Sequence, residues 1–448
     1  MSQQHPGSPD PGGPASPPAE RKPTFGDVFG NREAASFLAA YCLSSAGAML
    51  NRVAVTFLVW SNTGSSALAA ASFAISFAPY LGLAQVLGAI VDRYSYRNVM
   101  ILCDLLRAGL VALLLIPGMP VPAMMAVVFA IAAVQPAYSA ARTSTLAQIV
   151  TGDALSVAIA LNLSAAGVAQ IIGYLAGGLL AAIDPYTALA INAAMFVFSA
   201  FAIFVFVRHR PSVNKREERK HVLVETGEGL KTLRDNRVLR TVSFSIWGLY
   251  ALAAVPEGVA VLWAVHLGRG SVTQGSIMAV DAAATIVGML LFTRFVPSSL
   301  RDKLIRPLAF AAPLVLATAL LDPPLAGVIL IAIGIGLSTA IMAPMNATLA
   351  QCIPDGWRGR IVSAVNGGLQ LSQGVAIAAV GFVAELGVPV PYVVGVWGLL
   401  GLGIMALVTR NWPSAEEIER AKAAAAPPAQ RSPEASTRSS GQASTPPA

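Results

Sequence analysis

Charged residues are scarce in this sequence. Asp, Glu, Lys and Arg together make up 12% of its 448 residues, about half of the roughly 25% found in ordinary soluble domains. Hydrophobic residues reach 55%, and they fall in long runs instead of the half-apolar stripes of amphipathic surface helices. This composition excludes an ordinary soluble globular protein and indicates a chain that lies in a membrane.

Residues that serve catalysis, metal binding or disulfide formation are also few. The three cysteines, Cys42, Cys103 and Cys352, fall in or beside apolar runs and are expected to be packing residues. The four histidines are not paired for a metal. The sequence also lacks a phosphate-binding Gly-x-x-x-x-Gly-Lys-Ser/Thr loop, a Cys-x-x-Cys motif and a His-Glu-x-x-His motif. We therefore expect no enzymatic activity, no metal and no cofactor, and a nucleotide-driven pump is disfavoured.

No secretory signal peptide is recognisable, because the first 30 residues are rich in Pro, Gly and Ser and have no apolar centre. The first apolar run is therefore expected to direct the chain to the membrane. A hydrocarbon layer of about 30 Å needs about 20 apolar residues per helix, and the sequence contains twelve such runs. They lie near residues 35–60, 65–91, 98–117, 121–140, 154–182, 186–207, 239–265, 274–293, 307–321, 325–349, 361–385 and 392–409.

Lysine and arginine are distributed unequally between the two sides that twelve spans define. With the N-terminus inside, Arg269 is the only one of the 30 Lys and Arg residues in an outer loop, while Arg52 and Arg107 lie within spans. This asymmetry follows the positive-inside rule and predicts a multi-pass protein of the cell (plasma or inner) membrane with both termini in the cytoplasm. The net charge of +7 thus indicates orientation and contact with anionic lipids of the bilayer, not nucleic-acid binding.

The chain divides near its middle into two similar halves. The tetrapeptide Thr-Leu-Ala-Gln follows the fourth span at residues 145–148 and the tenth span at residues 348–351, which indicates a duplicated six-helix unit. We therefore expect an all-α membrane protein with twelve helices in two pseudo-symmetric bundles. The predicted division is a disordered N-tail (1–30), a six-helix bundle (31–207), a basic linker (208–238), a second six-helix bundle (239–410) and a disordered C-tail (411–448), within which residues 414–424 favour a short helix.

Three ionisable residues lie deep within predicted spans, where each costs on the order of 2.5–3.5 kcal/mol to insert. Arg52 on the first span, Glu257 on the seventh and Asp281 on the eighth are each seven or eight residues from the outer end of their span. At 1.5 Å per residue, all three lie about 10–12 Å below the outer surface. Because the internal repeat relates the first span to the seventh, Arg52 and Glu257 are expected to face each other across a central cavity.

Two interpretations of these residues remain open. In the functional one, Glu257 is a proton-coupling or substrate-binding carboxylate, whose charged form is stabilised by Arg52 and opposed by the like charge of Asp281. Protonation would then loosen the pair and favour one opening of the cavity over the other. In the structural one, the pair is a permanent salt bridge that joins the two halves.

Asp104 and Arg107 are one helical turn apart on the third span. They are predicted to form a structural ion pair that braces the neighbouring loop at residues 92–97. Polar side chains along the expected cavity are few, chiefly Gln135 and Asn346. This sparse set favours an amphiphilic or hydrophobic substrate over a sugar, which needs many hydrogen bonds.

The loop between the second and third spans has a distinctive pattern of a glycine, three residues, Asp-Arg and a second basic residue: Gly88, Asp92, Arg93 and Arg97. It resembles the loop between helices 2 and 3 of the major facilitator superfamily of secondary transporters. The resemblance implies that the Asp92 carboxylate lies against the start of helix 11, here Arg358-Gly-Arg360. There, free N–H groups and two arginines favour an anion. This set of residues would latch the cytoplasmic side shut.

The fifth span also resembles the same family. Gly173, Gly177 and Gly178 match the end of its antiporter motif, with Tyr174 in place of the motif's proline. The resemblance implies that neighbouring helices pack closely at these glycines. The tyrosine, and the absence of an arginine in the middle of the fourth span, depart from the pattern of proton-coupled members.

Residues 91–100, 103–108 and 353–360 look most like the macrolide-efflux and enterobactin-exporter branch of this superfamily. That resemblance implies export of an amphiphilic small molecule, such as a drug, an antibiotic or a siderophore-like metabolite, by proton antiport with alternating access. We expect the transporter to be a monomer. Two alternatives stay open: an uptake or facilitated-diffusion carrier of the same fold, and a membrane sensor or scaffold that does not transport.

Overall fold

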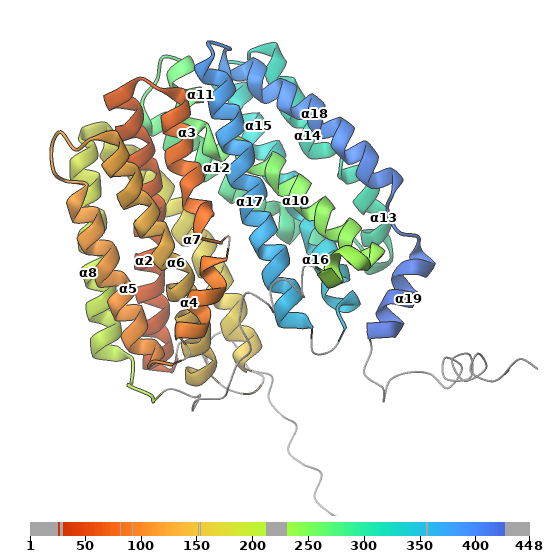
Figure 1. The fold of residues 1–448 in the computed structure, drawn as a ribbon, viewed down its shortest axis with the longest axis horizontal. Helices are drawn as coiled ribbons and strands as arrows, with labels where there is room; N and C mark the ends of the chain where they lie inside the picture. The colour runs from red at the N-terminus through yellow and green to blue at the C-terminus, as the bar shows by residue number, and fades with distance from the viewer. Residues whose placement is uncertain are drawn as a thin grey trace, which may run out of the picture.

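Helices make up every regular element that the structure describes. The computed structural model describes Gly26 and residues 30–80, 82–91, 93–150, 152, 154–211, 231–354 and 357–425. Within these ranges there is no β-strand, and the helices form two bundles that stand next to each other (Figure 1). The predicted all-α membrane fold is confirmed.

The elements follow the order of the predicted spans. The N-terminal bundle contains α2 (Arg32–Thr63), α3 (Ser66–Ala74), η1 (Ile75–Tyr80), α4 (Leu83–Val91), α5 (Tyr96–Leu113), α6 (Val121–Ile149), α7 (Ala154–Ile183) and α8 (Pro185–Phe206). The C-terminal bundle contains α10 (Arg237–Gly258), α11 (Ala260–His266), α12 (Ser271–Phe295), α13 (Ser298–Leu308), α14 (Ala311–Ala317), η2 (Thr318–Leu321), α15 (Leu325–Ser338), η3 (Thr339–Ile341), α16 (Met342–Cys352), α17 (Arg358–Glu385) and α18 (Val390–Arg410), followed by α19 (Ala415–Ala425).

Ten helices of the described part are long and apolar enough to cross a membrane. The other two predicted spans are helical as well. The run at residues 65–91 forms α3, η1 and α4 in series, and the run at 98–117 contains α5, which carries the charged residues Asp104 and Arg107. Each of the twelve predicted runs therefore corresponds to a helix or to a series of helical segments.

Proline marks two interruptions beside the centre of the molecule. Pro79 lies in η1, between α3 and α4, and Pro256 lies near the end of α10, before the break to α11. Proline lacks a backbone N–H and crowds the carbonyl one turn earlier, so it interrupts a regular helix. Irregular backbone at membrane depth is tolerated where it is buried in protein or lines a cavity.

The two bundles contact each other at the helix ends that the predicted topology places outside. The Ser271 hydroxyl on α12 donates a hydrogen bond of 2.9 Å to the Gly178 carbonyl on α7. The Ala67 N–H on α3 donates one of 3.0 Å to the Glu385 carboxylate on α17. Gly178 and Gly275 allow the backbones of α7 and α12 to approach so closely that a Cβ on Gly275 would lie 2.9 Å from the Gly178 Cα.

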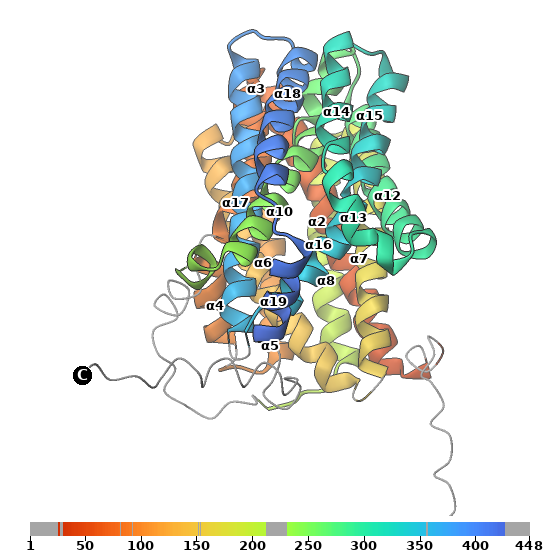
Figure 2. The same ribbon diagram turned by 90° about the vertical axis from the view of Figure 1, so that its right-hand side faces the viewer.

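At the opposite end the two bundles diverge. Figure 1 shows α4 and α6 separating from α16 and α17 toward the bottom of the view, whereas α3 and α17 stay together at the top. Figure 2 shows the same end from the side, with α4, α5 and α19 at the bottom. With the predicted orientation, the close contacts between the bundles lie at the outer ends of the helices, and the diverging ends face the cytoplasm.

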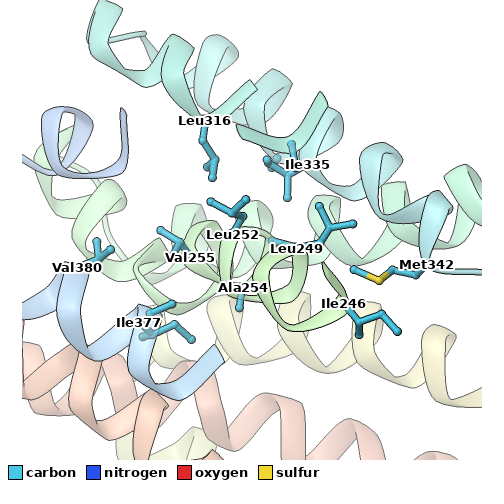
Figure 3. Close-up of a cluster of buried hydrophobic side chains, with 14 of the residues drawn as sticks. Ile246, Leu249, Leu252, Ala254, Val255, Leu316, Ile335, Met342, Ile377 and Val380 are labelled. Carbon is cyan, nitrogen blue, oxygen red and sulfur yellow. The ribbon is translucent and has the colours of Figure 1, made fainter. Parts of the chain in front are cut away.

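The interior of the C-terminal bundle is built around α10. Its side chains Ile246, Leu249, Leu252 and Val255 are at most 2% exposed and belong to one large apolar cluster. Figure 3 shows them among Leu316, Ile335, Met342 and Ile377 of the surrounding helices. Because this packing fixes α10 along its length, it also fixes the position of Glu257 near the end of the helix.

The structure differs from the sequence prediction at two helix ends. Helix α6 continues to Ile149, past the predicted end at residue 140, so Arg142 lies on the helix and not in a loop. Its guanidinium donates to Asn162 and lies 4.1 Å from the centre of the Tyr41 ring, which accounts for a charge at this position.

The second difference concerns the C-terminal tail, which was predicted to be disordered from residue 411. The segment Ala415–Ala425 forms α19, in agreement with the short helix predicted at 414–424. Glu417 of α19 pairs with Arg237 at 3.1 Å, and Ile418 and Ala421 pack against the apolar core of the C-terminal bundle. Most of the predicted disordered N-tail, most of the basic linker and the tail after residue 425 lie outside the described residues.

The close approach of α7 and α12 predicts opposite effects for one substitution at two glycines. Gly275→Ala places a Cβ 2.5 Å from the Tyr174 carbonyl oxygen and is expected to lower stability by about 1–3 kcal/mol through overpacking. Gly403→Ala on α18 meets no atom within 4 Å and is expected to be neutral or slightly stabilising, since alanine favours a helix. Thermal unfolding in detergent measures both variants. Equal melting temperatures would contradict the tight contact.

Candidate functional site

A cavity of about 410 Å³ lies between the two bundles. The N-terminal bundle contributes residues of α2, η1 and α7, and the C-terminal bundle contributes residues of α10, α12, η3, α16 and α17. The lining includes Met49, Arg52, Phe77, Gln170, Tyr250, Glu257, Asp281, Thr285, Ile286, Met289, Thr339, Met342, Leu369, Gln370 and Gln373. All three ionisable residues singled out in the spans are among them, so the structure brings these three together.

Arg52 and Glu257 face each other across this cavity. Arg52 Nη1 on α2 lies 3.8 Å from Glu257 Oε1 on α10, so the ion pair joins the two bundles. The guanidinium also lies over two aromatic rings, 5.3 Å from the centre of Phe73 and 5.6 Å from the centre of Phe77. Such cation–π contacts favour the charge by about 0.5–2 kcal/mol each. The positive charge is therefore held by the N-terminal bundle while its counter-ion belongs to the other.

Glu257 has a second partner that the sequence analysis did not identify. The Tyr174 hydroxyl on α7 donates a hydrogen bond to Glu257 Oε1, and it accepts one of 3.4 Å from the Gln170 amide. Tyr174 is fully buried. The glutamate of one bundle is thus held by an arginine and a tyrosine of the other. The sequence did show a large polar residue among the glycines of the fifth span. It did not show in which direction this side chain points.

Asp281 on α12 lines the same cavity and is only 8% exposed. Its Oδ1 atom accepts no hydrogen bond from any residue that the structure describes. A buried carboxylate without a cation or a donor is unfavourable. Asp281 is therefore a position that can take up a proton or bind a donor group of a ligand.

The other walls of the cavity are apolar, with amides and hydroxyls at a few places. Met49, Met289 and Met342 supply flexible, polarisable side chains that adapt to different ligand shapes. The prediction that Gln135 and Asn346 line the cavity is wrong: Gln135 accepts a hydrogen bond from Arg107, and the polar lining consists of other glutamines and threonines. The surface still suits an amphiphilic ligand more than a highly polar one.

The glycines of the fifth span lie at close helix contacts. A Cβ on Gly173 would lie 2.4 Å from the Ala46 carbonyl oxygen of α2, and one on Gly177 would lie 3.0 Å from the Leu50 Cα. Gly178 contacts α12, as described above. Since α7 contacts α2 and α12 at backbone distance, the glycines place Tyr174 next to Glu257.

Asp104 and Arg107 form a second ion pair, wholly within the N-terminal bundle. Arg107 Nη2 lies 2.6 Å from Asp104 Oδ1, and the two side chains are 2% and 0% exposed. The hydroxyls of Ser44 on α2 and Ser199 on α8 donate to the Asp104 carboxylate at 2.9 and 2.7 Å. Arg107 donates to Gln135 on α6. The pair therefore connects four helices of one bundle, and its hydrogen bonds do not reach the loop that it was predicted to brace.

The predicted latch residues do not form one cluster in the described part of the chain. Gly88 lies on α4, Asp92 lies outside the described residues, and Arg93 is exposed. Arg97 donates a hydrogen bond of 2.5 Å to the Phe204 carbonyl of α8, so it contacts its own bundle.

The remaining members of the predicted latch are the two arginines at the start of α17. Arg358 is exposed, and the Arg360 guanidinium lies 5.2 Å from the centre of the Trp357 ring. Asp92, the acidic residue of the predicted latch, lies outside the described residues, so its contacts with these arginines are not defined. The latch therefore stays a prediction.

Comparison with known families agrees with this architecture. The family model of the Major Facilitator Superfamily matches residues 37–377. The chain matches none of the curated protein sequences.

Several solved structures share the fold at low sequence identity. A bacterial homologue of the human lysosomal transporter Spinster, in an inward-facing and unoccupied conformation, has a TM-score of 0.60 and 13% identity over 87% of this chain and 97% of that one. The nucleoside transporter NupG has a TM-score of 0.66 and 14% identity over 85% and 99%. A peptide transporter, POT, in complex with sulfate has a TM-score of 0.70 and 11% identity over 89% and 97%. At this identity, they show the fold alone.

The buried network around Asp104 predicts a large loss of stability when one charge is removed. Asp104→Asn leaves the Arg107 guanidinium buried without a counter-ion and is expected to cost about 3–5 kcal/mol. Combining Asp104→Asn with Arg107→Gln removes both charges and is expected to recover part of that loss. Thermal unfolding in detergent compares the single and double variants. A double variant less stable than Asp104→Asn would show that the charge pair is not the main contribution.

Proposed function

The chain belongs to the major facilitator superfamily, and on this basis we propose that it exports an amphiphilic small molecule by proton antiport. As a member it is a multi-pass membrane transporter. The solved structures that share its fold include transporters of nucleosides and of peptides, so fold alone does not identify the substrate. The proposal rests instead on the residues of the central cavity.

The observation that carries the proposal is the contact of Glu257 with Arg52 and Tyr174. Glu257 belongs to the C-terminal bundle and both partners belong to the N-terminal bundle, and the two bundles must move relative to each other if access alternates. A carboxylate whose counter-ion moves away changes its affinity for protons. This contact therefore supplies a direct coupling between the protonation of Glu257 and the conformation of the protein.

This arrangement supports a transport cycle with three steps. When the cavity opens outward, the bundles separate at their outer ends and Glu257 loses Arg52 and Tyr174, so it binds a proton from outside. Return to the inward-open state reforms the contact, and the proton leaves Glu257 toward the cytoplasm. When the protein next opens outward, substrate bound from the cytoplasm compensates for the contacts that Glu257 loses with Arg52 and Tyr174. Inward proton movement and outward substrate movement are then linked.

Asp281 gives the cavity a second carboxylate with a free oxygen. In this proposal it binds a donor or cationic group of the substrate, or a second proton. The methionines and aromatic rings bind the apolar part of the substrate. A volume of about 410 Å³ lies in the range of small-molecule sites, and it suits a drug, an antibiotic or a siderophore-like metabolite.

The direction of transport is inferred from the resemblance of the loops to the macrolide-efflux and enterobactin-exporter branch. Location in the cell membrane and cytoplasmic termini are proposed from the distribution of Lys and Arg. We further propose that the protein acts as a monomer and that Asp92, with Arg358 and Arg360, closes the cytoplasmic side in the outward-open state. Uncoupled or inward transport by the same fold is the second candidate, favoured by Tyr174 in place of the antiporter proline.

The coupling role of Glu257 predicts loss of proton movement in Glu257→Gln. Proteoliposomes containing a pH-sensitive dye are mixed with hydrophobic drugs and siderophore-like compounds. The wild-type protein is expected to show substrate-dependent proton flux, and this flux is expected to fall at least about tenfold in Glu257→Gln. A tenfold loss corresponds to the free energy of about one pKa unit. Glu416→Gln removes an exposed carboxylate of α19, 81% exposed, and is expected to behave like the wild type.

The same assay separates the two candidates. Substrate movement without proton flux, unchanged in Glu257→Gln, would contradict antiport and leave a facilitator with a structural ion pair. Tyr174→Phe removes one hydrogen bond but no charge. It is expected to retain substrate-dependent proton flux, because the charge pair between Arg52 and Glu257 remains.

A further inference from the structure

A second hollow lies away from the central cavity, between the start of α10 and the end of α18. It has a volume of about 490 Å³ and is lined by Arg237, Arg240, Thr241, Phe244, Leu407 and Asn411. It lies at the end of the molecule where α19 begins (Figure 1). We call it the α10–α18 groove.

The groove opens because the two helices pack closely only farther from this end. A Cβ on Gly248 would lie 2.8 Å from the Met405 side chain, and the Trp397 indole donates a hydrogen bond of 3.4 Å to the Ala251 carbonyl. Toward the start of α10, this close packing gives way to larger and more exposed side chains. Phe244 is 52% exposed and Leu407 is 64% exposed. In a membrane these side chains face lipid, so the floor of the groove is apolar.

The open end of the groove carries positive charge. Arg237 and Arg240 are three residues apart on α10 and therefore lie on the same face of the helix. Arg237 is 59% exposed and pairs with Glu417 of α19. Arg240 donates to the Arg234 carbonyl at 2.7 Å, and it contacts no carboxylate among the residues that the structure describes. The groove thus has an excess of positive charge next to an apolar floor.

We propose that the α10–α18 groove binds an anionic phospholipid of the leaflet that faces this end of the protein. The phosphate lies between Arg237 and Arg240, and an acyl chain lies along Phe244 and Leu407. Arginine matches the geometry of phosphate oxygens, and basic pockets between membrane helices recognise lipid headgroups. A free phosphate would not use the apolar floor, and a zwitterionic lipid would not neutralise the excess charge.

Helix α19 adjusts this site. The Glu417 carboxylate contacts Arg237 at 3.1 Å, where a phosphate oxygen would also bind. The carboxylate therefore competes with the lipid for one edge of the guanidinium. Neutralising Glu417 is expected to strengthen lipid binding without any change at the groove itself.

Native mass spectrometry of the detergent-purified protein tests the proposal, with phosphatidylglycerol and phosphatidylcholine titrated separately. Each arginine at an anionic surface contributes about fivefold to affinity, so the double variant Arg237→Gln/Arg240→Gln is expected to bind phosphatidylglycerol about 25-fold more weakly. The matched control is Arg294→Gln/Lys303→Gln, which removes two exposed charges, one from the last turn of α12 and one from α13. It is expected to bind like the wild type.

The following results test whether the groove binds an anionic lipid and whether α19 competes with it. Glu417→Gln is expected to raise the affinity for phosphatidylglycerol, and no change would refute the competition by α19. Equal weakening in the control variant, or equal binding of both lipids by the wild type, would overturn the site. Displacement of the lipid by inorganic phosphate at comparable concentration would show that the groove binds a free anion instead of a lipid.

Discussion

The central cavity is organised around the ion pair between Arg52 and Glu257, which crosses from one bundle to the other. Each charge alone would be unfavourable at this depth of a bilayer, so each bundle requires the other. The guanidinium is additionally held over Phe73 and Phe77, and the carboxylate accepts a hydrogen bond from Tyr174. The contact therefore crosses the cavity that the close helix contacts at one end of the molecule enclose between the two bundles.

The second ion pair clarifies what is distinctive about the first. Asp104 and Arg107 lie on one helix, with their charged atoms 2.6 Å apart, and are almost completely buried. The hydroxyls of Ser44 and Ser199 donate hydrogen bonds to the carboxylate. Such a pair does not change when the bundles move. Arg52 and Glu257 are 3.8 Å apart, keep exposed fractions of 27% and 17%, and belong to different bundles. Of these two pairs, it is Arg52 and Glu257 that can separate and rejoin when the bundles move, which is what the proposed coupling requires.

Much of the fold could be predicted from the sequence, because membrane spans are long apolar runs and charges mark their ends. The meeting of Arg52 with Glu257 followed from equal depth and from the internal repeat. The partners of Gln135 and Tyr174 could not be found in this way. Their contacts depend on how each helix is rotated about its axis, and apolar periodicity does not report rotation where both lipid and protein interior are apolar. Helix α19 is short and largely polar, and its position depends on contacts far apart in the sequence: the pair with Arg237 and the packing of Ile418 and Ala421 against the core.

The two ends of the molecule are held by different forces. At the end that the predicted topology places outside, glycines bring α7 and α12 to backbone distance, and hydrogen bonds such as that from Ser271 to Gly178 complete the contact. At the other end, Lys and Arg are concentrated, and Glu417 of α19 pairs with one of these arginines, Arg237. Close packing at short range is insensitive to ions, whereas exposed charges respond to salt and to anionic lipid. On the proposed mechanism, the energy difference between the inward-open and outward-open states therefore responds to the composition of the membrane mainly through the end that carries these charges.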